Sequence, residues 1–236
     1  MPEQPVIGKP SDVEIVRSYA TSFRVDENPI SEGGMWLNGR TDGVDWADIL
    51  TRDGLAHAES IPTLVAERRS EQGDTIDAPE GDYNDPTAIL KGQWGRNQYA
   101  KARVRSRNQT ADKYHEVELR LRSNVVPHEI PGYEVFFRCL KTDEAYAEIV
   151  RWEGPLGEWT SLCRKNGAEF GVKDGDIIEA TIIGNVIKGY INGVEVTSAI
   201  DDTFSSGAPG IGFNYGAEET ARDHGLTYFE VVTWDD

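Results

Sequence analysis

The chain has 236 residues, 38% of them hydrophobic and 28% charged, which suits a globular protein with a substantial buried core. Its formal net charge of −17 argues against nucleic acid or an anionic membrane as a partner, because both are bound through Lys and Arg surfaces. The charge argues only mildly against a polyanionic glycan, since a local basic cleft would override it. The alternative explanation of the negative charge is that it only keeps the protein soluble.

The N-terminal segment is predicted to be an arm followed by a first strand. Residues 1–12 are rich in proline, and we expect them to dock on a partner chain, giving an oligomer or assembly, or on their own domain. Val13–Val25 alternates well enough for a strand, with Val13, Ile15 and Phe23 as core candidates. The chain begins without a basic n-region or an apolar h-region, and no stretch is long and apolar enough to span a membrane. We therefore expect a protein made in the cytoplasm, or an extracellular one if a signal was removed.

The remaining residues, 13–236, are expected to form a single domain, because the chain has no internal repeat and no change in composition. Segments 32–39 and 46–50 are predicted to frame a loop and short strands. Ile61–Glu71 is the one plausible helix, since a proline suits its first turn and its apolar residues have helical spacing. Gly73–Pro86 is acidic and rich in glycine and proline, which predicts a surface loop.

Two strictly alternating segments follow, Tyr99–Arg107 and Tyr114–Arg122, and we predict that they pair as a hairpin about residues 108–113. The charged side chains of this hairpin have two interpretations. They form either a cleft lined by Arg and Glu or, as the structural alternative that we favour, a solvated ion ladder on one sheet. The cross-strand neighbours would be Arg105 with Glu116 and Arg103 with Glu118, and the same surface would also carry Arg120 and Arg122.

A predicted meander, Tyr133–Leu140, Ala145–Trp152 and Glu158–Arg164, contains both cysteines of the chain. Cys139 and Cys163 are not directly opposite each other in this register. We therefore expect two free thiols and a chain made in a reducing compartment.

An aromatic group on the same meander is the second candidate binding site. Tyr146, Glu148 and Trp152 share one face, and Trp159 would lie opposite Trp152 across the turn. Aromatic rings beside a carboxylate suit a sugar, because its C–H faces stack on rings and its hydroxyls bind oxygens. The alternative, which we favour, is a hydrophobic core with Glu148 at its rim.

The C-terminal third is predicted to be a series of strands, Ile177–Ile183, Val186–Ile191, Val194–Thr197, a strand opening at Pro209, and Leu226–Trp234. Asn192-Gly193 is a type I′ turn signal, because both central residues of that turn need positive φ. The hairpin INGVEV, the acidic DD loop, GAPGIG and the last strand, together with the upstream W..NQYAKARV, resemble concanavalin A-like (laminin-G-like) jelly-roll domains. The resemblance implies an all-β, two-sheet antiparallel jelly-roll sandwich with at most one or two short helices. That fold carries lectins, glycosidases, polysaccharide lyases and inert spacers.

Enzyme motifs of such domains are incomplete here. Glu118-Leu119-Arg120 resembles the end of the Arg-x-Glu-Leu-Arg strand of jelly-roll alginate lyases, but Glu116 replaces its first arginine and the other motifs of that family are missing. The Glu-x-Asp-x-x-Glu motif of laminarinase-like enzymes is absent. Its closest candidates, Glu148 and Glu153, have an odd spacing that places them on opposite faces of a strand.

Metal signals are weak. Laminin-G-like sandwiches often bind one Ca²⁺ through loop oxygens, and Asp201 and Asp202 are candidate ligands on that resemblance. The four histidines show no zinc spacing. We expect either no cofactor or one structural Ca²⁺.

The leading functional hypothesis is a non-catalytic recognition or structural module that binds a glycan or a partner protein. A virion surface or tail component would fit a lectin-like sandwich without a signal or disulfides. The alternative is a polysaccharide lyase or glycoside hydrolase, and a third is a carbohydrate-binding module from a larger enzyme. The candidate ligand-binding residues are Tyr146, Glu148, Trp152, Trp159, Arg103, Arg105, Glu118 and Arg120.

Overall fold

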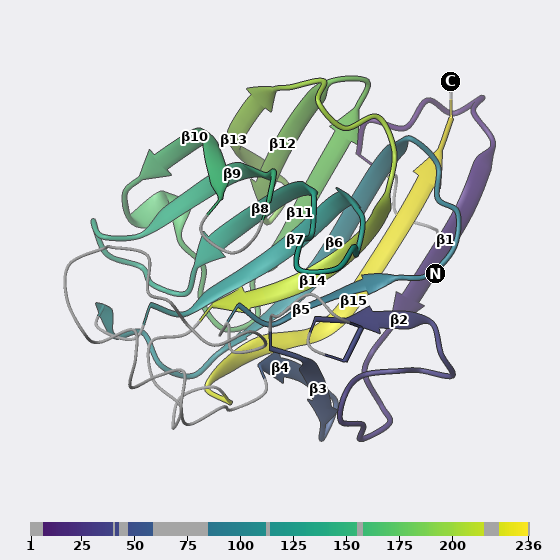
Figure 1. Ribbon diagram of the computed structural model, residues 1–236. Coiled ribbons are helices and arrows are strands. Elements are labelled where there is room, and N and C mark those ends of the chain that lie inside the picture. The colour runs from purple at the N-terminus through teal and green to yellow at the C-terminus, as the bar shows by residue number, and fades with distance from the viewer. Residues whose placement is uncertain are drawn as a thin grey trace.

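The protein folds into two antiparallel sheets packed face to face (Figure 1). The computed structural model describes residues 7–39, 41–42, 47–58, 85–111, 114–154, 158–214 and 222–235. Over these ranges the regular structure is fifteen strands and one short 3₁₀ turn, Ala168–Phe170, and no helix is long and apolar enough to cross a bilayer. The predicted helix Ile61–Glu71 and nearly all of the predicted loop 73–86 lie outside the described residues.

The eight-stranded sheet is centred on β6 and the long C-terminal strand β15, which pair along most of their length. The other edge of β15 is shared by β1 and β4, which pair with different parts of it (Figure 1). The order is β13-β12-β11-β6-β15-β4-β3, with β1 beside β15. The strand bounds are β1 Ile15–Thr21, β3 Ile49–Arg52, β4 Leu55–Ala58, β6 Asn97–Ser106, β11 Ile177–Ile183, β12 Val186–Ile191, β13 Val194–Ile200 and β15 His224–Trp234.

The seven-stranded sheet contains the predicted meander, which forms its β8, β9 and β10. The order is β10-β9-β8-β7-β14-β5-β2. The strand bounds are β2 Trp36–Asn38, β5 Thr87–Leu90, β7 Glu116–Ser123, β8 Gly132–Arg138, β9 Tyr146–Trp152, β10 Trp159–Asn166 and β14 Ala208–Asn214.

The core lies between the sheets and is built from alternate residues of each strand, as half-buried antiparallel strands require. These residues are fully buried, and they include Leu119, Val135 and Ile149 from one sheet and Ala102, Ile178 and Phe229 from the other. The fold is therefore the predicted all-β, two-sheet jelly-roll sandwich.

Local turn chemistry predicted the C-terminal hairpin correctly. Strands β11 and β12 have the predicted bounds, and β12 and β13 join through Asn192 and Gly193, whose φ angles are 52° and 78°. At the other end of the chain, Phe23 is buried as predicted. Ile15 is not, because 42% of its surface is exposed on a strand that covers only the edge of β15.

The predicted hairpin between Tyr99–Arg107 and Tyr114–Arg122 is wrong. The two segments form β6 and β7, which lie in different sheets. Strand β6 pairs with β11 and β15, and β7 pairs with β8 and β14, so Arg103 and Arg105 are not cross-strand neighbours of Glu118 and Glu116. Alternation fixes which face of a strand is apolar, and that face is buried equally well whether the next strand pairs beside it or packs across the sandwich.

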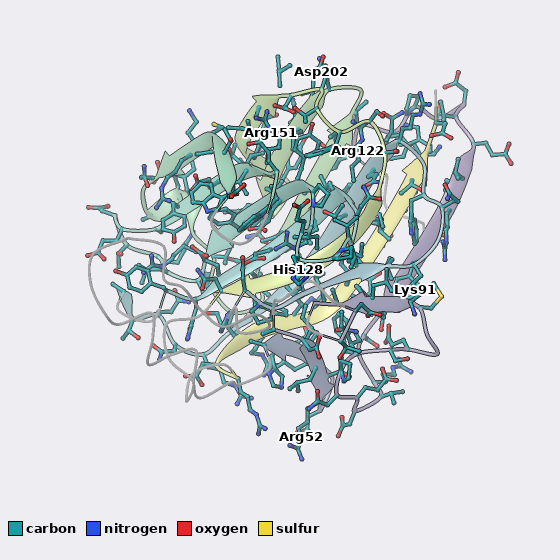
Figure 2. All side chains as sticks on the ribbon, viewed as in Figure 1. Arg52, Lys91, Arg122, His128, Arg151 and Asp202 are labelled. Carbon is teal, nitrogen blue, oxygen red and sulfur yellow. The ribbon has the colours of Figure 1, made fainter. Side chains whose placement is uncertain are left out.

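Arg122, which is labelled in Figure 2, joins loops of both sheets through its hydrogen bonds. Its Nε donates to the carbonyl oxygen of Arg96 at 2.8 Å, Nη1 to that of Phe204 at 2.9 Å and Nη2 to that of Gly184 at 2.8 Å. Its φ of 47° breaks the strand alternation, so Arg122 leaves the face that it was predicted to share with Arg120. One guanidinium thus satisfies three carbonyls that would otherwise need other donors.

The end of the predicted arm contacts its own domain. Ile7 of the arm packs against a small buried cluster formed by Tyr99, Val232 and Trp234, and so does Val13, the first residue after the arm. Residues 1–6 of the arm lie outside the described residues.

Candidate functional site

The seven-stranded sheet has charged and aromatic side chains on the surface opposite to its core residues, which we call the polar face. Glu118, Arg120, Glu134 and Glu148 all lie on it, and each is at most 3% exposed. The predicted solvated ion ladder is therefore wrong for β7, because these groups are buried. The polar residues of this face include Glu116, Glu118 and Arg120 of β7, Glu134 and Arg138 of β8, Tyr146, Glu148 and Trp152 of β9, and Asn214 of β14.

Arg120 lies at the centre of the polar face between two carboxylates. Its Nη2 is 2.7 Å from Oε2 of Glu134 and 3.5 Å from Oε2 of Glu118. Glu134 also accepts a hydrogen bond of 2.8 Å from Nε1 of Trp152. The guanidinium carbon is 5.8 Å from the centroid of the Trp152 ring, within cation–π range. Carboxylates, cation and indole thus form one connected group.

Burial raises the pKa of both carboxylates at Arg120. Desolvation and the charge of Glu134 raise the pKa of Glu118 well above its ordinary value. Desolvation raises the pKa of Glu134 to about 8, although the Arg120 charge lowers it. One guanidinium cannot balance two buried carboxylates, so we infer that the pair holds a proton at neutral pH. A protonated carboxyl beside an ionised one is the arrangement that supports acid and base chemistry.

Glu116 lies in a second polar group on the same face. It accepts hydrogen bonds from the Tyr146 hydroxyl and, at 2.9 Å, from Nδ2 of Asn214. Nη1 of Arg138 in turn donates to the Tyr146 hydroxyl at 3.3 Å. Burial raises the pKa of Glu116 even though the bonds from Tyr146 and Asn214 lower it. The pKa of Tyr146 is also raised, by burial and by the Glu116 charge.

Strand β10 gives the polar face an accessible edge. Nη1 of Arg164 lies 2.7 Å from Oε2 of Glu148, and Oγ of Ser161 donates to the other carboxylate oxygen. The Arg164 guanidinium also lies 3.7 Å from the centroid of the Tyr146 ring. Trp159 pairs with Trp152 as predicted, with ring centroids 6.4 Å apart. Trp159 is 44% exposed and the Arg164 side chain 42%, so this edge is open to solvent.

Gly212 of β14 makes room for the Glu118 side chain, because it lies in register with Glu118. A Cβ at position 212 would overlap Oε2 of Glu118 and lie 3.3 Å from Nε of Arg120. We expect Gly212→Ala to lower the free energy of unfolding by about 1–3 kcal/mol, the usual cost of an overpacked interior. Urea denaturation measures it, and Glu118→Ala in the same chain should restore part of the loss. If the effects of Gly212→Ala and Glu118→Ala on the free energy of unfolding were simply additive, a clash between the new methyl group at position 212 and Glu118 would not be the cause of the loss.

The structure divides the predicted site residues between two places. Tyr146, Glu148, Trp152, Trp159, Glu118 and Arg120 lie on the polar face, whereas Arg103 and Arg105 lie on the outer surface of the eight-stranded sheet. Tyr146, Glu148 and Trp152 of the aromatic group are buried, as the core interpretation requires, whereas Trp159 is exposed, and the whole group shares its face with charged side chains. Sequence reasoning missed Glu134 and Arg164. The alternation of Glu134, Phe136 and Arg138 along β8 was the available signal for Glu134.

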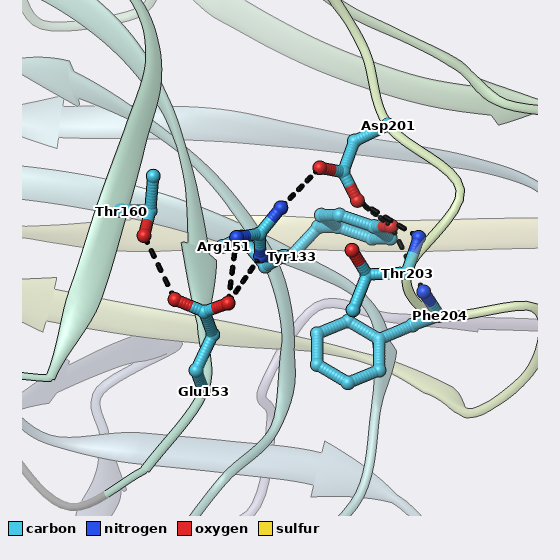
Figure 3. Close-up of polar contacts among 7 residues, drawn as sticks. All are labelled: Tyr133, Arg151, Glu153, Thr160, Asp201, Thr203 and Phe204. Carbon is cyan, nitrogen blue, oxygen red and sulfur yellow. Dashed lines mark hydrogen bonds and ion pairs between the residues drawn. The ribbon is translucent and has the colours of Figure 1, made fainter.

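The loop that follows β13 is held by Asp201, one of the two predicted calcium ligands (Figure 3). Its carboxylate accepts hydrogen bonds from the Tyr133 hydroxyl at 2.6 Å, from the backbone N–H of Thr203 at 2.9 Å, and from Arg151. Although partial burial raises it, the bonds from Tyr133 and Thr203 hold the pKa of Asp201 below its ordinary value. Asp202 is exposed.

Asp201→Asn is expected to lower the free energy of unfolding by about 1–3 kcal/mol, because three donors share the carboxylate that is lost. Asp202→Asn, the exposed neighbour, should change it by less than about 0.5 kcal/mol. Equilibrium urea denaturation at pH 7 compares the two variants. Equal losses of stability in the two variants would show that the hydrogen bonds to the Asp201 carboxylate do not stabilise the loop.

Among the residues that the structure describes, no group of three or more His, Cys, Asp or Glu side chains is arranged to hold a metal ion. Calcium binding stays a prediction, and the Tm of the protein in CaCl₂ and in EDTA tests it. Cys139 and Cys163 are both unpaired, and burial raises the pKa of the Cys139 thiol to about 12.

The sequence matches no known family and no curated protein. Solved structures do resemble the fold. An endo-β-1,3-glucanase from Pyrococcus furiosus superposes with a TM-score of 0.55 at 12% identity, over 94% of this chain and 95% of that chain. A carbohydrate-binding module, CBM66, from Bacillus subtilis gives a TM-score of 0.51 at 12% identity, over 87% and 97%.

A structure from work on endo-acting O-glycanases of the human gut microbiota gives a TM-score of 0.57 at 10% identity, covering 93% of this chain and 99% of that chain. At these identities the similarity is one of fold. The chain is therefore a concanavalin A-like jelly-roll sandwich, as the resemblance of its C-terminal third implied.

Proposed function

We propose that this protein binds a glycan at the accessible edge of the polar face. The observation that carries the proposal is the solvent-exposed indole of Trp159 next to Trp152, with the Arg164–Glu148 ion pair on the same surface. An exposed ring stacks on the apolar face of a sugar, and an adjacent charged pair binds its hydroxyls. The similar solved structures, which include a carbohydrate-binding module and glycan-degrading enzymes, support this class of ligand.

The test is a glycan-array screen followed by titration calorimetry with the best ligand. Trp159→Ala should weaken binding by about tenfold or more, because it removes a stacking ring. Lys165→Ala is the matched control, since Lys165 is an exposed cation on the same strand and pairs with Ala147 rather than with Glu148. Binding that is equal in both variants would contradict the proposed edge, and silence on the array would favour a structural protein with a protein partner.

Glycan cleavage is a second candidate function, favoured by the two carboxylates that share Arg120. Glycoside hydrolases need one carboxyl that carries a proton and one that is ionised on either side of the scissile bond. Both glutamates are buried, so cleavage requires the polar face to open to the substrate.

An assay for new reducing ends tests hydrolysis, and absorbance from an unsaturated uronate tests the lyase alternative. Glu134→Gln should abolish turnover while Lys165→Ala retains it. Binding without turnover would leave recognition as the function.

A further inference from the structure

The outer surface of the eight-stranded sheet has a groove that is separate from the polar face. Its volume is about 700 Å³. The side chains on this surface of β6 alternate with the buried core residues Ala100, Ala102 and Val104, so they point away from the core of the sandwich. The groove is lined by Ser22, Lys101, Arg103, Ile177, Thr227, Tyr228 and Glu230.

Lys101 and Arg103 give the groove two cations without salt bridges. Across the described ranges neither side chain has a hydrogen-bond or ion-pair partner, whereas Nε of Arg105, two residues further on the same face, lies 3.2 Å from Asp174. The carboxylates beside Lys101 have other donors. Glu179 accepts from the Tyr99 hydroxyl at 2.7 Å, and Glu230 accepts from the Tyr228 hydroxyl at 2.8 Å. Both carboxylates still place negative charge beside Lys101, but neither forms an ion pair with Lys101 or Arg103, so the ammonium and guanidinium donors are free to bind a ligand.

Tyr228 provides a fixed aromatic surface in the same groove. It lies in register with Arg103, and its hydroxyl is held by Glu230. Burial, together with the hydrogen bond to Glu230, raises the pKa of Tyr228 to about 12, so the phenol stays neutral and its one hydroxyl proton stays in the bond to Glu230. Thr227 and Ser22 add hydroxyl groups to the lining. An aromatic ring and hydroxyls beside paired cations suit a sugar ring that carries an acidic substituent.

We propose that this groove is a second ligand site, which binds an oligosaccharide bearing carboxylate or sulfate groups. The arginine fork recognises such planar or tetrahedral anions through paired hydrogen bonds, and the lysine adds a point charge. The inference rests on the proposed function for the class of ligand, a glycan, but it uses different residues. With sites on opposite outer surfaces of the sandwich, one chain would bridge two glycan chains and gain avidity.

Titration calorimetry with tetragalacturonate, a heparin tetrasaccharide and laminaritetraose tests the proposal. At least one of the two acidic ligands should bind, and Lys101→Gln/Arg103→Gln should weaken that binding by about 10- to 100-fold. The matched control is Arg107→Gln, an exposed arginine that follows β6 and does not line the groove. The double variant and the control change only exposed or half-buried side chains, so we expect both proteins to fold, and circular dichroism checks this.

The outcomes separate the groove from the polar face. Laminaritetraose binding that is sensitive to Trp159→Ala belongs to the polar face. If laminaritetraose does not bind, the tests of the groove with the two acidic oligosaccharides are unaffected. The proposal is overturned if neither acidic ligand binds, if the double variant binds them as well as the control, or if inorganic sulfate at equal concentration competes fully. Addition of the acidic ligand should also shift the NMR resonances of the Thr227 and Tyr228 backbone amides, which is an independent sign of binding in the groove.

Discussion

Arg120→Met should be the most destabilising single substitution on the polar face, with a loss of about 3–5 kcal/mol in the free energy of unfolding. The guanidinium is fully buried and faces Glu134 and Glu118, so its removal leaves the remaining negative charge of this buried pair without a cation. Urea denaturation at pH 7 measures the loss. It should be smaller at pH 5, because the raised pKa values of the two carboxyls favour their neutral forms as the pH falls.

Two further variants separate lost pairing from lost packing. Arg103→Met makes the same chemical change at an exposed position and should cost less than about 1 kcal/mol. Arg120→Met combined with Glu118→Leu and Glu134→Leu should recover much of the stability, because a buried charged group can be replaced by packed apolar side chains. If Arg120→Met alone were as stable as the wild type, Arg120 would not be needed to neutralise Glu118 and Glu134.

The parts of the fold that were predicted correctly depend on neighbours in sequence. The turn at Asn192-Gly193 fixes the register of β12 and β13 because few residues adopt its φ angles. The pairing of β6 was not predictable in this way. Its partners β11 and β15 lie far along the chain, and alternation along β6 is compatible with either a hairpin or a connection that crosses the sandwich.

The candidate site shows the same limit. Trp152 and Trp159 were placed together correctly because they are close in sequence and their strands pair. Glu118 and Arg120 were expected in solvent, since charged residues are rarely buried without partners. Their burial depends on Glu134, which is on a neighbouring strand and was not identified. A buried charge becomes predictable only when its partner strand is known.

The stability of the protein is expected to fall as the pH rises from about 5 to 8, owing to Glu134. Its pKa is about 8 in the folded protein and near the ordinary 4.5 in the unfolded chain, so between these values the folded state holds a proton that the unfolded state has released. The free energy of unfolding then decreases by up to about 1.4 kcal/mol per pH unit for this group. Glu118 and Glu116, whose pKa values are also raised, act in the same direction.

Glu134→Gln tests this contribution together with its effect on Glu118, and a variant is needed because other groups titrate in the same range. Burial lowers the pKa of His57, so its contribution to stability rises with pH up to about 6.5 and opposes that of Glu134. His57 is present in both proteins, so its effect cancels in the difference between wild type and variant. The free energy of unfolding of the wild type minus that of the variant, measured by urea denaturation at pH 5, 6, 7 and 8, should decrease steadily as the pH rises. A difference that is constant, or that increases, would mean that Arg120 keeps Glu134 ionised in the folded protein and that the proton resides on Glu118 instead.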